Sequence, residues 1–360
     1  MKKITKRILI TSAVTAGAGV VLMGAGIALG GWPGVVFTKD GIRSPYDQRT
    51  PYRQEKKEID PFSELSLYIG SEADVSVAAS EDGKYYIEYT LDGNYSEPKY
   101  ELKNGKLSFT QQDHDGYMTG MFGLSIGNVS GEDSYIKVYV PKGTVLDAAD
   151  IYNDYGDVRW SAVNGKAVSI EADSGDVKLE QSETTSMELI LNDGDASVDT
   201  LKTGTFLLQS DYGDSTLADV SGKDLTVQAE CGEVDMERVS FENMAVEAQD
   251  GDVLTREVSC SSADLTLEYG DLQWDAKKLE NLTCQTECGD VDLVLPEVME
   301  QYQFDLQLEY GDLSLPENAP HDLYREEDGE VSYRILASEK NAGKKISVMS
   351  EDGDVKVRYR

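Results

Sequence analysis

The sequence predicts an all-β protein: a single-stranded parallel β-solenoid (β-helix) of 19-residue coils, wound right-handedly and preceded by one transmembrane helix. Three observations lead to this prediction. Glycine recurs at intervals of 19 residues, apolar residues recur at fixed positions between the glycines, and an uncharged segment lies near the N-terminus.

The glycine repeat runs through seven successive intervals of 19 residues, with irregular relatives at Gly311 and Gly353. A fixed period of this size indicates a solenoid, in which each unit buries surface only against its neighbours. Sharp turns between strands commonly need a positive φ, which glycine adopts without a Cβ clash. We therefore predict a structural turn at each glycine of the series: Gly156, Gly175, Gly194, Gly213, Gly232, Gly251, Gly270 and Gly289.

Apolar residues recur at fixed distances after each glycine. The fourth residue is nearly always apolar, from Trp160 to Leu293, and the twelfth and fourteenth behave likewise. Side chains on one face of a strand are two residues apart, so the odd gaps between these columns require three bends per coil. Nineteen residues leave no room for a useful crossover helix, so equivalent strands must pair in parallel, with right-handed winding as the usual hand.

The flanks of the regular repeat predict further segments. Residues 61–150 contain alternating apolar stretches without the 19-residue register, which predicts an irregular β cap and the first coils. The regular solenoid is expected over residues 151–314. Residues 315–360 predict a loop insertion and a C-terminal capping coil, because an open parallel edge would recruit other chains. A binding site is expected where the register breaks, at residues 61–150 and 315–345.

The N-terminus predicts membrane attachment. Residues 1–7 carry four positive charges, and residues 8–31 are uncharged. At about 1.5 Å per residue, this segment can cross a hydrocarbon core of about 30 Å. The basic flank predicts a cytoplasmic tip and an extracellular C-terminal domain, that is, a single-pass protein of the bacterial cell membrane. A cleaved signal peptide is the alternative for residues 1–31, and residues 32–60 are expected to form an extended linker.

Composition and charge exclude several functions. The net charge is −34, and residues 1–60 hold ten basic against five acidic residues, so the acidity lies in the remainder. Such a polyanion repels nucleic acid and favours cations, basic peptides or positively charged partners. The two histidines, His114 and His321, have no cysteine or second histidine at metal-ligand spacing. We therefore expect no enzymatic activity and no cofactor.

The acids beside the glycines allow an alternative function. They recur once per coil, about every 4.8 Å, and acids recur again two residues before the glycine. Hard cations such as Ca²⁺ can bridge carboxylates, so a calcium-binding acidic rod is one alternative and a polysaccharide-acting β-helix enzyme is a more remote one. The candidate cation ladder is Asp157, Asp176, Asp195, Asp214, Glu233, Asp252, Asp271 and Asp290.

One further column recurs every 57 residues, which is three coils. Tyr155, Tyr212 and Tyr269 stand directly before the glycine, as do Cys231 and Cys288. At roughly 14 Å spacing, the tyrosines could form a binding stripe or could pack at the edge of the turn. The same spacing puts the two cysteines beyond the reach of a disulfide.

Three segments together resemble a known family. They are LYIGSEADVSV at 67–77, VYVPKG at 138–143 running into DYGDV at 154–158, and the repeated Gly-Asp-Val-x-Leu. From about residue 60 to 360, the chain is similar to the bacterial putative-adhesin family, a domain of unknown function shared with LiaG-like envelope proteins. The resemblance implies a non-enzymatic β-solenoid behind a membrane helix, acting as an adhesin, scaffold or envelope-stress component on a cell-envelope protein or wall polymer. It supplies no catalytic residues.

Overall fold

The computed structural model describes residues 50–93, 95–112, 133–320, 323–327 and 329–360, with 36–38, 41–43 and a few isolated positions between 12 and 22. The predicted membrane segment at 1–31, much of the predicted linker and both histidines lie outside these residues. In the part of the chain that is described, no helix has the length and apolarity needed to cross a membrane. Residues 1–50 and 114–132 form one unit, of which the hairpin of β1 (Val36–Thr38) and β2 (Gly41–Arg43) is described.

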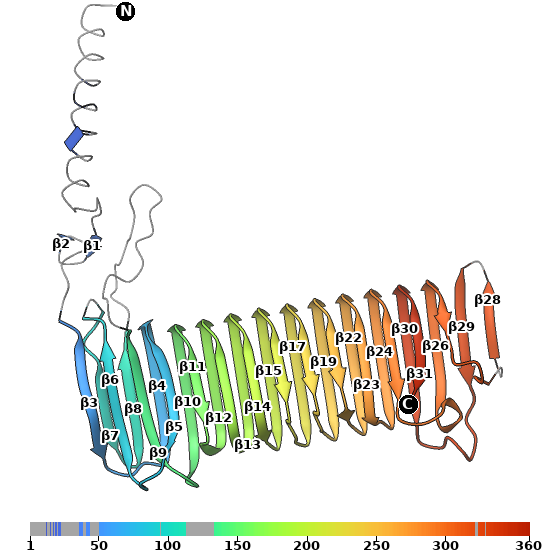
Figure 1. Ribbon diagram of the computed structural model, residues 1–360, viewed down its shortest axis with the longest axis horizontal. Coiled ribbons are helices and arrows are strands. Elements are labelled where there is room, and N and C mark those ends of the chain that lie inside the picture. Colours follow the sequence, from blue (N-terminus) through green and yellow to red (C-terminus); the bar gives the residue numbers. More distant parts are fainter. Residues whose placement is uncertain are drawn as a thin grey trace, which may run out of the picture. The chain divides into compact units, whose positions relative to one another are not determined.

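The second unit, residues 51–113 and 133–360, is an array of stacked coils that confirms the all-β prediction (Figure 1). Each coil contributes one strand to each of two sheets, and we call this array the rod. Sheet 1 holds the strands that precede the turn glycine in the regular coils, together with the strands that pair with them at the two ends. In stacking order these are β7 (Lys99–Lys103), β8 (Lys106–Gln111), β4 (Glu64–Glu72), β10 (Val145–Tyr155), β12 (Asn164–Ser174), the second half of β13 (Val177–Asp193), β15 (Thr205–Tyr212), β17 (Asp224–Cys231), β19 (Asn243–Asp250), β22 (Ser262–Tyr269), β24 (Asn281–Cys288), β30 (Lys345–Asp352), β26 (Gln303–Tyr310), β29 (Glu330–Ile335) and β28 (Leu323–Glu327).

Sheet 2 holds the strands that follow the turn glycine in the regular coils, together with the strands that pair with them at the two ends. In the same stacking order these are β3 (Tyr52–Ile59), β6 (Tyr85–Leu91), β9 (Tyr135–Pro141), β5 (Asp74–Ser80), β11 (Val158–Ser161), the first half of β13, β14 (Ala196–Lys202), β16 (Ser215–Ala218), β18 (Val234–Glu237), β20 (Val253–Arg256) with β21 (Val258–Ser259), β23 (Leu272–Lys278), β25 (Val291–Leu295), β31 (Val355–Tyr359) and β27 (Leu313–Ser314). The single helical turn described in the rod is η1 (Met299–Gln301).

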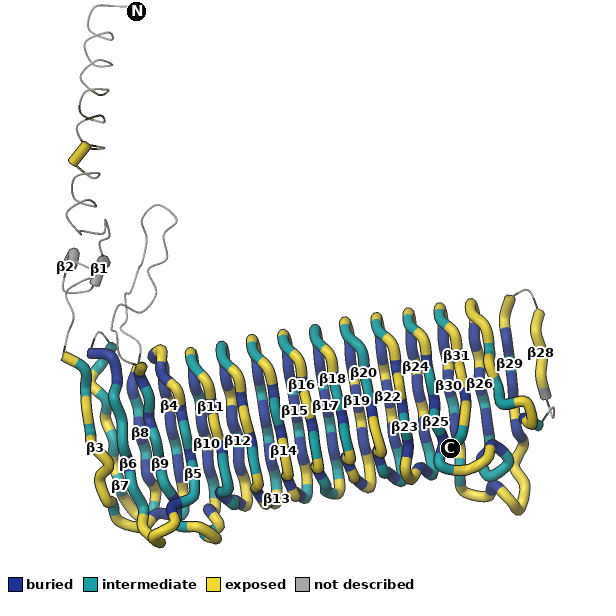
Figure 2. The backbone as a smooth tube through the Cα atoms, in the orientation of Figure 1, coloured by how far each residue is buried: buried dark blue, intermediate teal, exposed yellow. Residues whose placement is uncertain are grey.

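The predicted apolar columns form the core between the two sheets. Consecutive coils pair in parallel with an offset of 19 residues, as Phe206 with Leu225 in sheet 1 and Leu217 with Met236 in sheet 2. The columns four, twelve and fourteen residues after the glycine are buried, so a mainly apolar core runs along the rod, and a few buried polar residues such as Ser210, Ser215 and Thr286 interrupt it (Figure 2). The one polar member of the first column is Thr255, whose hydroxyl accepts a hydrogen bond from the backbone N–H of Asp275.

The coil bends at two kinds of left-handed residue. The eight turn glycines have φ between 110° and 154°. A second bend lies six residues later, where non-glycine residues have φ between 50° and 59°: Ala162, Gln181, Thr200, Asp219, Arg238 and Glu257. This bend lies where the odd spacing of the apolar columns required one. Its residue type could not be predicted, because six different side chains occupy it.

The two ends of the rod are interleaved. At the N-terminal end, the first coil (β4 and β5) lies between the later coils β8–β9 and β10–β11. At the C-terminal end, the last coil (β30 and β31) lies between β24–β25 and the earlier coil β26–β27. The predicted capping role of the C-terminal coil is therefore wrong. Residues 303–314 skip one coil position, the last strands fill it, and the antiparallel hairpin of β28 and β29 covers the edge instead.

Aromatic side chains close the core at both ends. At the N-terminal end, Phe62 packs on Tyr85 and Tyr89 on Phe109. At the C-terminal end, Phe304 lies between Tyr302 and Tyr333, both of which are fully buried. The hydroxyls of the two buried tyrosines donate to backbone carbonyls of Leu279 and Pro320, so neither polar group is left unsatisfied in the core.

Candidate functional site

Two features require glycine at each position of the glycine column: its positive φ and the close approach of the neighbouring coil's backbone. A Cβ added at any of the seven glycines from Gly175 to Gly289 would lie 2.0–2.3 Å from the carbonyl oxygen of the glycine one coil earlier. That oxygen belongs to a backbone held by strands on both sides. The column is therefore structural, because no other residue fits it.

The acids that follow the glycines bond to one another's backbone. Oδ1 of Asp157 accepts a hydrogen bond from the N–H of Asp176 (3.1 Å), and Oδ1 of Asp176 accepts from Asp195 (3.0 Å). The same contact recurs along the rod and passes through the inserted C-terminal coil, where Asp354 donates to Asp290 and accepts from Asp312. These carboxylates thus act as staples between coils, a role that needs no cation.

The ladder of acids is interrupted at Glu233, whose side chain makes no described hydrogen bond to the backbone of Asp252. Its own N–H donates to Asp214, so the break lies on one side only. Among the described residues, no three His, Cys, Asp or Glu side chains are grouped so that they could hold a metal ion.

This interruption provides a matched test of the staple. We expect Asp214→Ala to lower the free energy of unfolding by about 0.5–1.5 kcal/mol, because the N–H of Glu233 loses its acceptor. Glu233→Ala should change it by less than about 0.5 kcal/mol, since no staple is lost. Urea unfolding of both variants measures the difference, and equal losses would show that the carboxylate bonds contribute nothing.

The residues directly before the turn glycines form an exposed edge, which we call the tyrosine ridge. Its tyrosines are about half exposed or more: Tyr155 53%, Tyr212 58%, Tyr269 55% and Tyr310 66%. In stacking order the ridge reads Glu72, Tyr155, Ser174, Asp193, Tyr212, Cys231, Asp250, Tyr269, Cys288, Asp352 and Tyr310. An acid, a tyrosine and a small residue therefore follow one another with a period of three coils.

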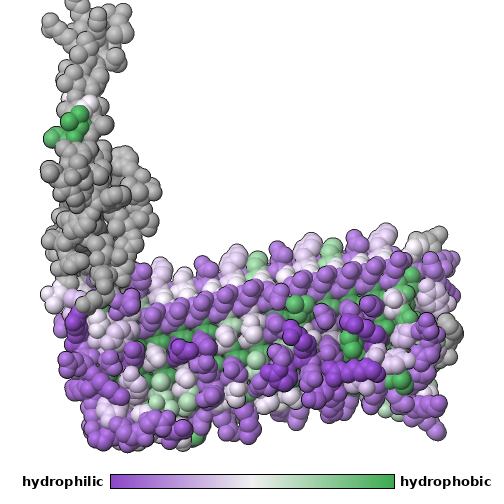
Figure 3. Space-filling model, viewed as in Figure 1, coloured by the Kyte–Doolittle hydropathy of each residue, from purple (hydrophilic) through white to green (hydrophobic). Residues whose placement is uncertain are grey.

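The inserted C-terminal coil completes this period. In sequence, Tyr310 follows Tyr269 by 41 residues and falls outside the 57-residue spacing. In the rod, Cys288 and Asp352 lie between them, so Tyr310 is three coils from Tyr269. Along the upper edge in Figure 3, the ridge shows this alternation above a continuous hydrophilic row. Exposure favours the binding stripe over edge packing as the role of these rings.

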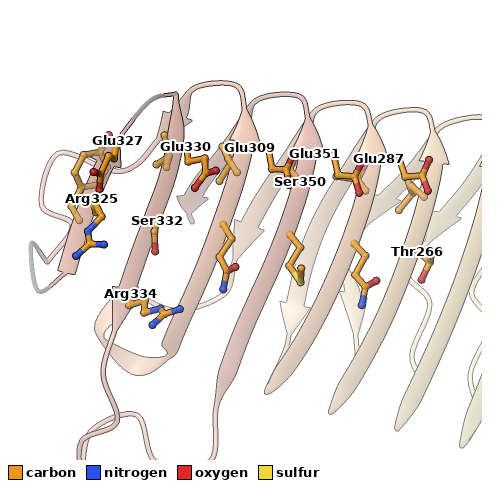
Figure 4. A pocket seen from close by; sticks show the side chains of 18 of the residues that line it. Thr266, Glu287, Glu309, Arg325, Glu327, Glu330, Ser332, Arg334, Ser350 and Glu351 are labelled. Carbon is orange, nitrogen blue, oxygen red and sulfur yellow. The ribbon is translucent and has the colours of Figure 1, made fainter.

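A shallow groove of about 940 Å³ lies on the outer face of sheet 1 near the C-terminal end (Figure 4). One side of it is formed by six exposed glutamates on six adjacent strands, which we call the glutamate row. Arg325 and Arg334 lie beside this row, on β28 and β29. In stacking order the row is Glu268, Glu287, Glu351, Glu309, Glu330 and Glu327.

Acidic residues also lie on the outer face of sheet 1 toward the N-terminal end of the rod. The Tyr152 hydroxyl shares its one proton between the carboxylates of Asp154 (2.5 Å) and Asp173 (2.8 Å), and its ring stacks on Tyr68. Partial burial and these two carboxylates raise the pKa of Tyr152 well above its usual range. Burial, together with neighbouring acids, also raises the pKa of Glu171. The outer face of sheet 1 therefore favours positively charged partners.

The sequence located these features only in part. Seven residues that line the groove lie in the stretch from Tyr324 to Arg334, inside the predicted register break at 315–345. Four glutamates of the row stand two residues before a turn glycine (Gly270, Gly289, Gly311 or Gly353), where the sequence shows a recurring acid. Glu327 and Glu330 join the row only through the antiparallel pairing of β28 and β29, which no spacing predicts.

Two regions of the chain match one known protein family. Residues 62–206 and again 197–358 match the family Toastrack DUF4097. No curated protein matches the chain.

Several solved structures are similar to the chain. One is a "putative adhesin" from Bacteroides fragilis, with 13% identity over 86% of this chain and 97% of that chain and a TM-score of 0.34. Another is a "putative lipid binding protein" from Parabacteroides distasonis, with 13% identity over 85% and 97% and a TM-score of 0.44. A third is a "putative adhesin" from Parabacteroides merdae, with 14% identity over 67% and 91% and a TM-score of 0.40.

Proposed function

Because the chain belongs to the Toastrack DUF4097 family, as the three sequence segments predicted, we propose that it is a membrane-anchored rod of the bacterial surface. Its function is to bind a cell-envelope partner along its side, as an adhesin or envelope scaffold, and it is not an enzyme. The observation that carries this proposal is the tyrosine ridge, whose exposed rings recur every three coils over the length of the rod.

The membrane anchor in this proposal rests on the sequence alone. The basic residues 1–7 and the uncharged residues 8–31 would hold the chain in the membrane with the rod outside. A rod fixed at one end presents its long edges to the surrounding envelope. Binding along an edge suits such a protein better than binding in a deep pocket.

The chemistry of the ridge favours a partner with basic side chains. Each tyrosine has an acid one coil away, such as Asp193 beside Tyr212 and Asp250 beside Tyr269. A ring face and a carboxylate about 4.8 Å apart can bind a lysine or arginine by cation–π contact and charge together. The net charge of −34 attracts the same partner and repels anionic wall polymers. A basic envelope protein is therefore the favoured class.

The test removes the rings from the ridge of the full-length chain. We expect Tyr→Ser at Tyr155, Tyr212, Tyr269 and Tyr310 together to reduce recovery of the envelope partner at least about tenfold, because each ring contributes roughly 0.5–1 kcal/mol. Affinity purification from cells that express each variant measures the recovery. Unchanged recovery would refute the ridge as the binding surface.

Two controls separate binding from folding and from composition. Leu336→Ser changes an exposed side chain that follows β29, at the end of the strand opposite the ridge, and should leave recovery unchanged. Exchanging Tyr212 and Cys231 moves one ring by a single coil without changing the composition. If the three-coil spacing matters, this exchange should weaken recovery. Nonspecific binding to exposed tyrosine rings would leave recovery unchanged. Recovery of a neutral glycan in place of a protein would overturn the basic class of partner.

A further inference from the structure

The two ends of the rod carry complementary edge strands. Within the described residues, β7 pairs only with β8 at one end of sheet 1, and β28 pairs only with β29 at the other (Figure 1). Both strands have five residues. Each leaves one row of backbone donors and acceptors open to another chain. From the directions, steps and charges of these strands, we propose that the rod assembles head to tail, with β28 of one copy pairing with β7 of the next.

The strand directions permit this contact. β29 is antiparallel to β26 and β28 is antiparallel to β29, so β28 runs in the direction of the coils. β7 is antiparallel to β8 and therefore runs against the coils. When copies stack along the rod axis, β28 and β7 meet as an antiparallel pair. The contact continues the antiparallel order that each cap already has.

The two ends also have complementary steps. Beyond the coil of β8 and β9, sheet 1 adds one described strand, β7, and sheet 2 adds two, β6 and β3. Beyond the coil of β26 and β27, sheet 1 adds β29 and β28, whereas sheet 2 adds no described strand. The overhanging β3 of one copy therefore fits the recess beside β28 of another. Leu315 and Ala319 already cover the core at the floor of that recess.

The outward side chains select one register. On β7 the outward residues are Lys99, Glu101 and Lys103, and on β28 they include Arg325 and Glu327. Aligning the two strands centre to centre places Lys99 opposite Glu327 and Glu101 opposite Arg325. A slip of two residues would place Glu101 opposite Glu327 or Lys99 opposite Arg325, and like charges directly opposite each other destabilise a sheet.

Three of the four charges at this junction are unpaired within the described part of their own chain. Among the described residues, Lys99, Arg325 and Glu327 make no ion pair, whereas Glu101 lies 3.7 Å from Lys103 in an exposed pair that can exchange partners. Glu327 is the last member of the glutamate row, so Lys99 of the next copy would neutralise the end of six aligned carboxylates. Charges on an exposed edge deter indiscriminate pairing, whereas opposite charges in register admit one partner. Because the two surfaces differ, the contact is heterologous, and because copies stack along the rod axis it extends into linear filaments and not into a closed ring.

Charge reversal tests the proposal in the full-length chain, purified in mild detergent. The first variant reverses the β7 end (K99E/E101R), and the second reverses the β28 end (R325E/E327K). The unchanged chain should form end-to-end assemblies that lengthen with concentration, as followed by sedimentation velocity and electron microscopy. Each double variant should weaken this association by roughly tenfold or more, because two attractive pairs become repulsive.

Restoring the charge pairs distinguishes loss of the proposed contact from misfolding of the variants. Mixing the two double variants restores both pairs at every junction, so the mixture should form filaments although neither variant does so alone. The quadruple variant should assemble by itself. Lys345→Glu serves as the control, because Lys345 is exposed on β30 and lies at neither end of the rod, and this variant should assemble like the unchanged chain. Monomers at all concentrations, side-by-side contacts, or assembly that ignores the reversals would overturn the proposal.

Discussion

Replacing Gly232 with alanine is expected to lower the free energy of unfolding by about 2–6 kcal/mol, a large share of the stability of a typical domain. Gly232 has φ +129°, and an added Cβ would lie 2.1 Å from the carbonyl oxygen of Gly213. Neither strain can relax locally, because the backbones of both coils are held by strands on either side. Urea unfolding followed by circular dichroism measures the loss.

Gly143 provides the control for this substitution. It has φ +82°, within the left-handed region, but no atom lies within 4 Å of the position of its Cβ. Gly143→Ala should therefore cost only about 1–2 kcal/mol, from the backbone conformation alone. If both variants lost the same stability, the close approach between coils would not be what excludes other residues from the column.

Deleting residues 345–360 is expected to have the second large effect. The deletion removes an internal coil, with the buried side chains Ile346, Val348, Val355 and Val357. At roughly 1.5–3 kcal/mol for each buried side chain, the loss is about 6–12 kcal/mol. It also separates β26 from β24 by one empty coil position. We expect the C-terminal part of the rod to unfold, which hydrogen exchange can measure strand by strand.

Two observations check that the interleaved position, and not chain length, is responsible. In the intact chain, the amides of β30 should exchange as slowly as those of the central coils, whereas chain ends commonly fray. A synthetic peptide of residues 345–360 should restore protection to β26 when it is added to the truncated chain. Fast exchange in β30, or a truncated chain with protection unchanged elsewhere, would contradict the interleaved arrangement.

The sequence predicted the coil well because periodic features have direct geometric causes. Trp160 and Leu293 mark a column that must face inward, and glycine marks a turn that other residues avoid. The second bend was predicted by spacing but not by residue type, because a single left-handed residue tolerates side chains as different as Ala162 and Arg238.

The order of the last coils could not be predicted from the sequence. Gly311 and Gly353 both look like continuations of the series, and either of their coils would stack acceptably on residues 281–295. In the structure, the coil that contains Gly353 pairs with these residues. Every feature that depends on stacking order was missed for the same reason. Examples are the place of Tyr310 on the ridge and the extension of the glutamate row to β28.

The interleaved ends separate the order of synthesis from the order of stacking. The coil of β26 and β27 has no neighbouring coil on its inner side until residues 345–360 have been made. At the other end, both edges of β4 are paired only after β8 and β10 have been made. The rod therefore cannot be completed by adding coils one at a time as the chain emerges. A chain cut before residue 345 would leave an unpaired edge on β24 and on β26, so the damage would show as an open strand edge inside the rod.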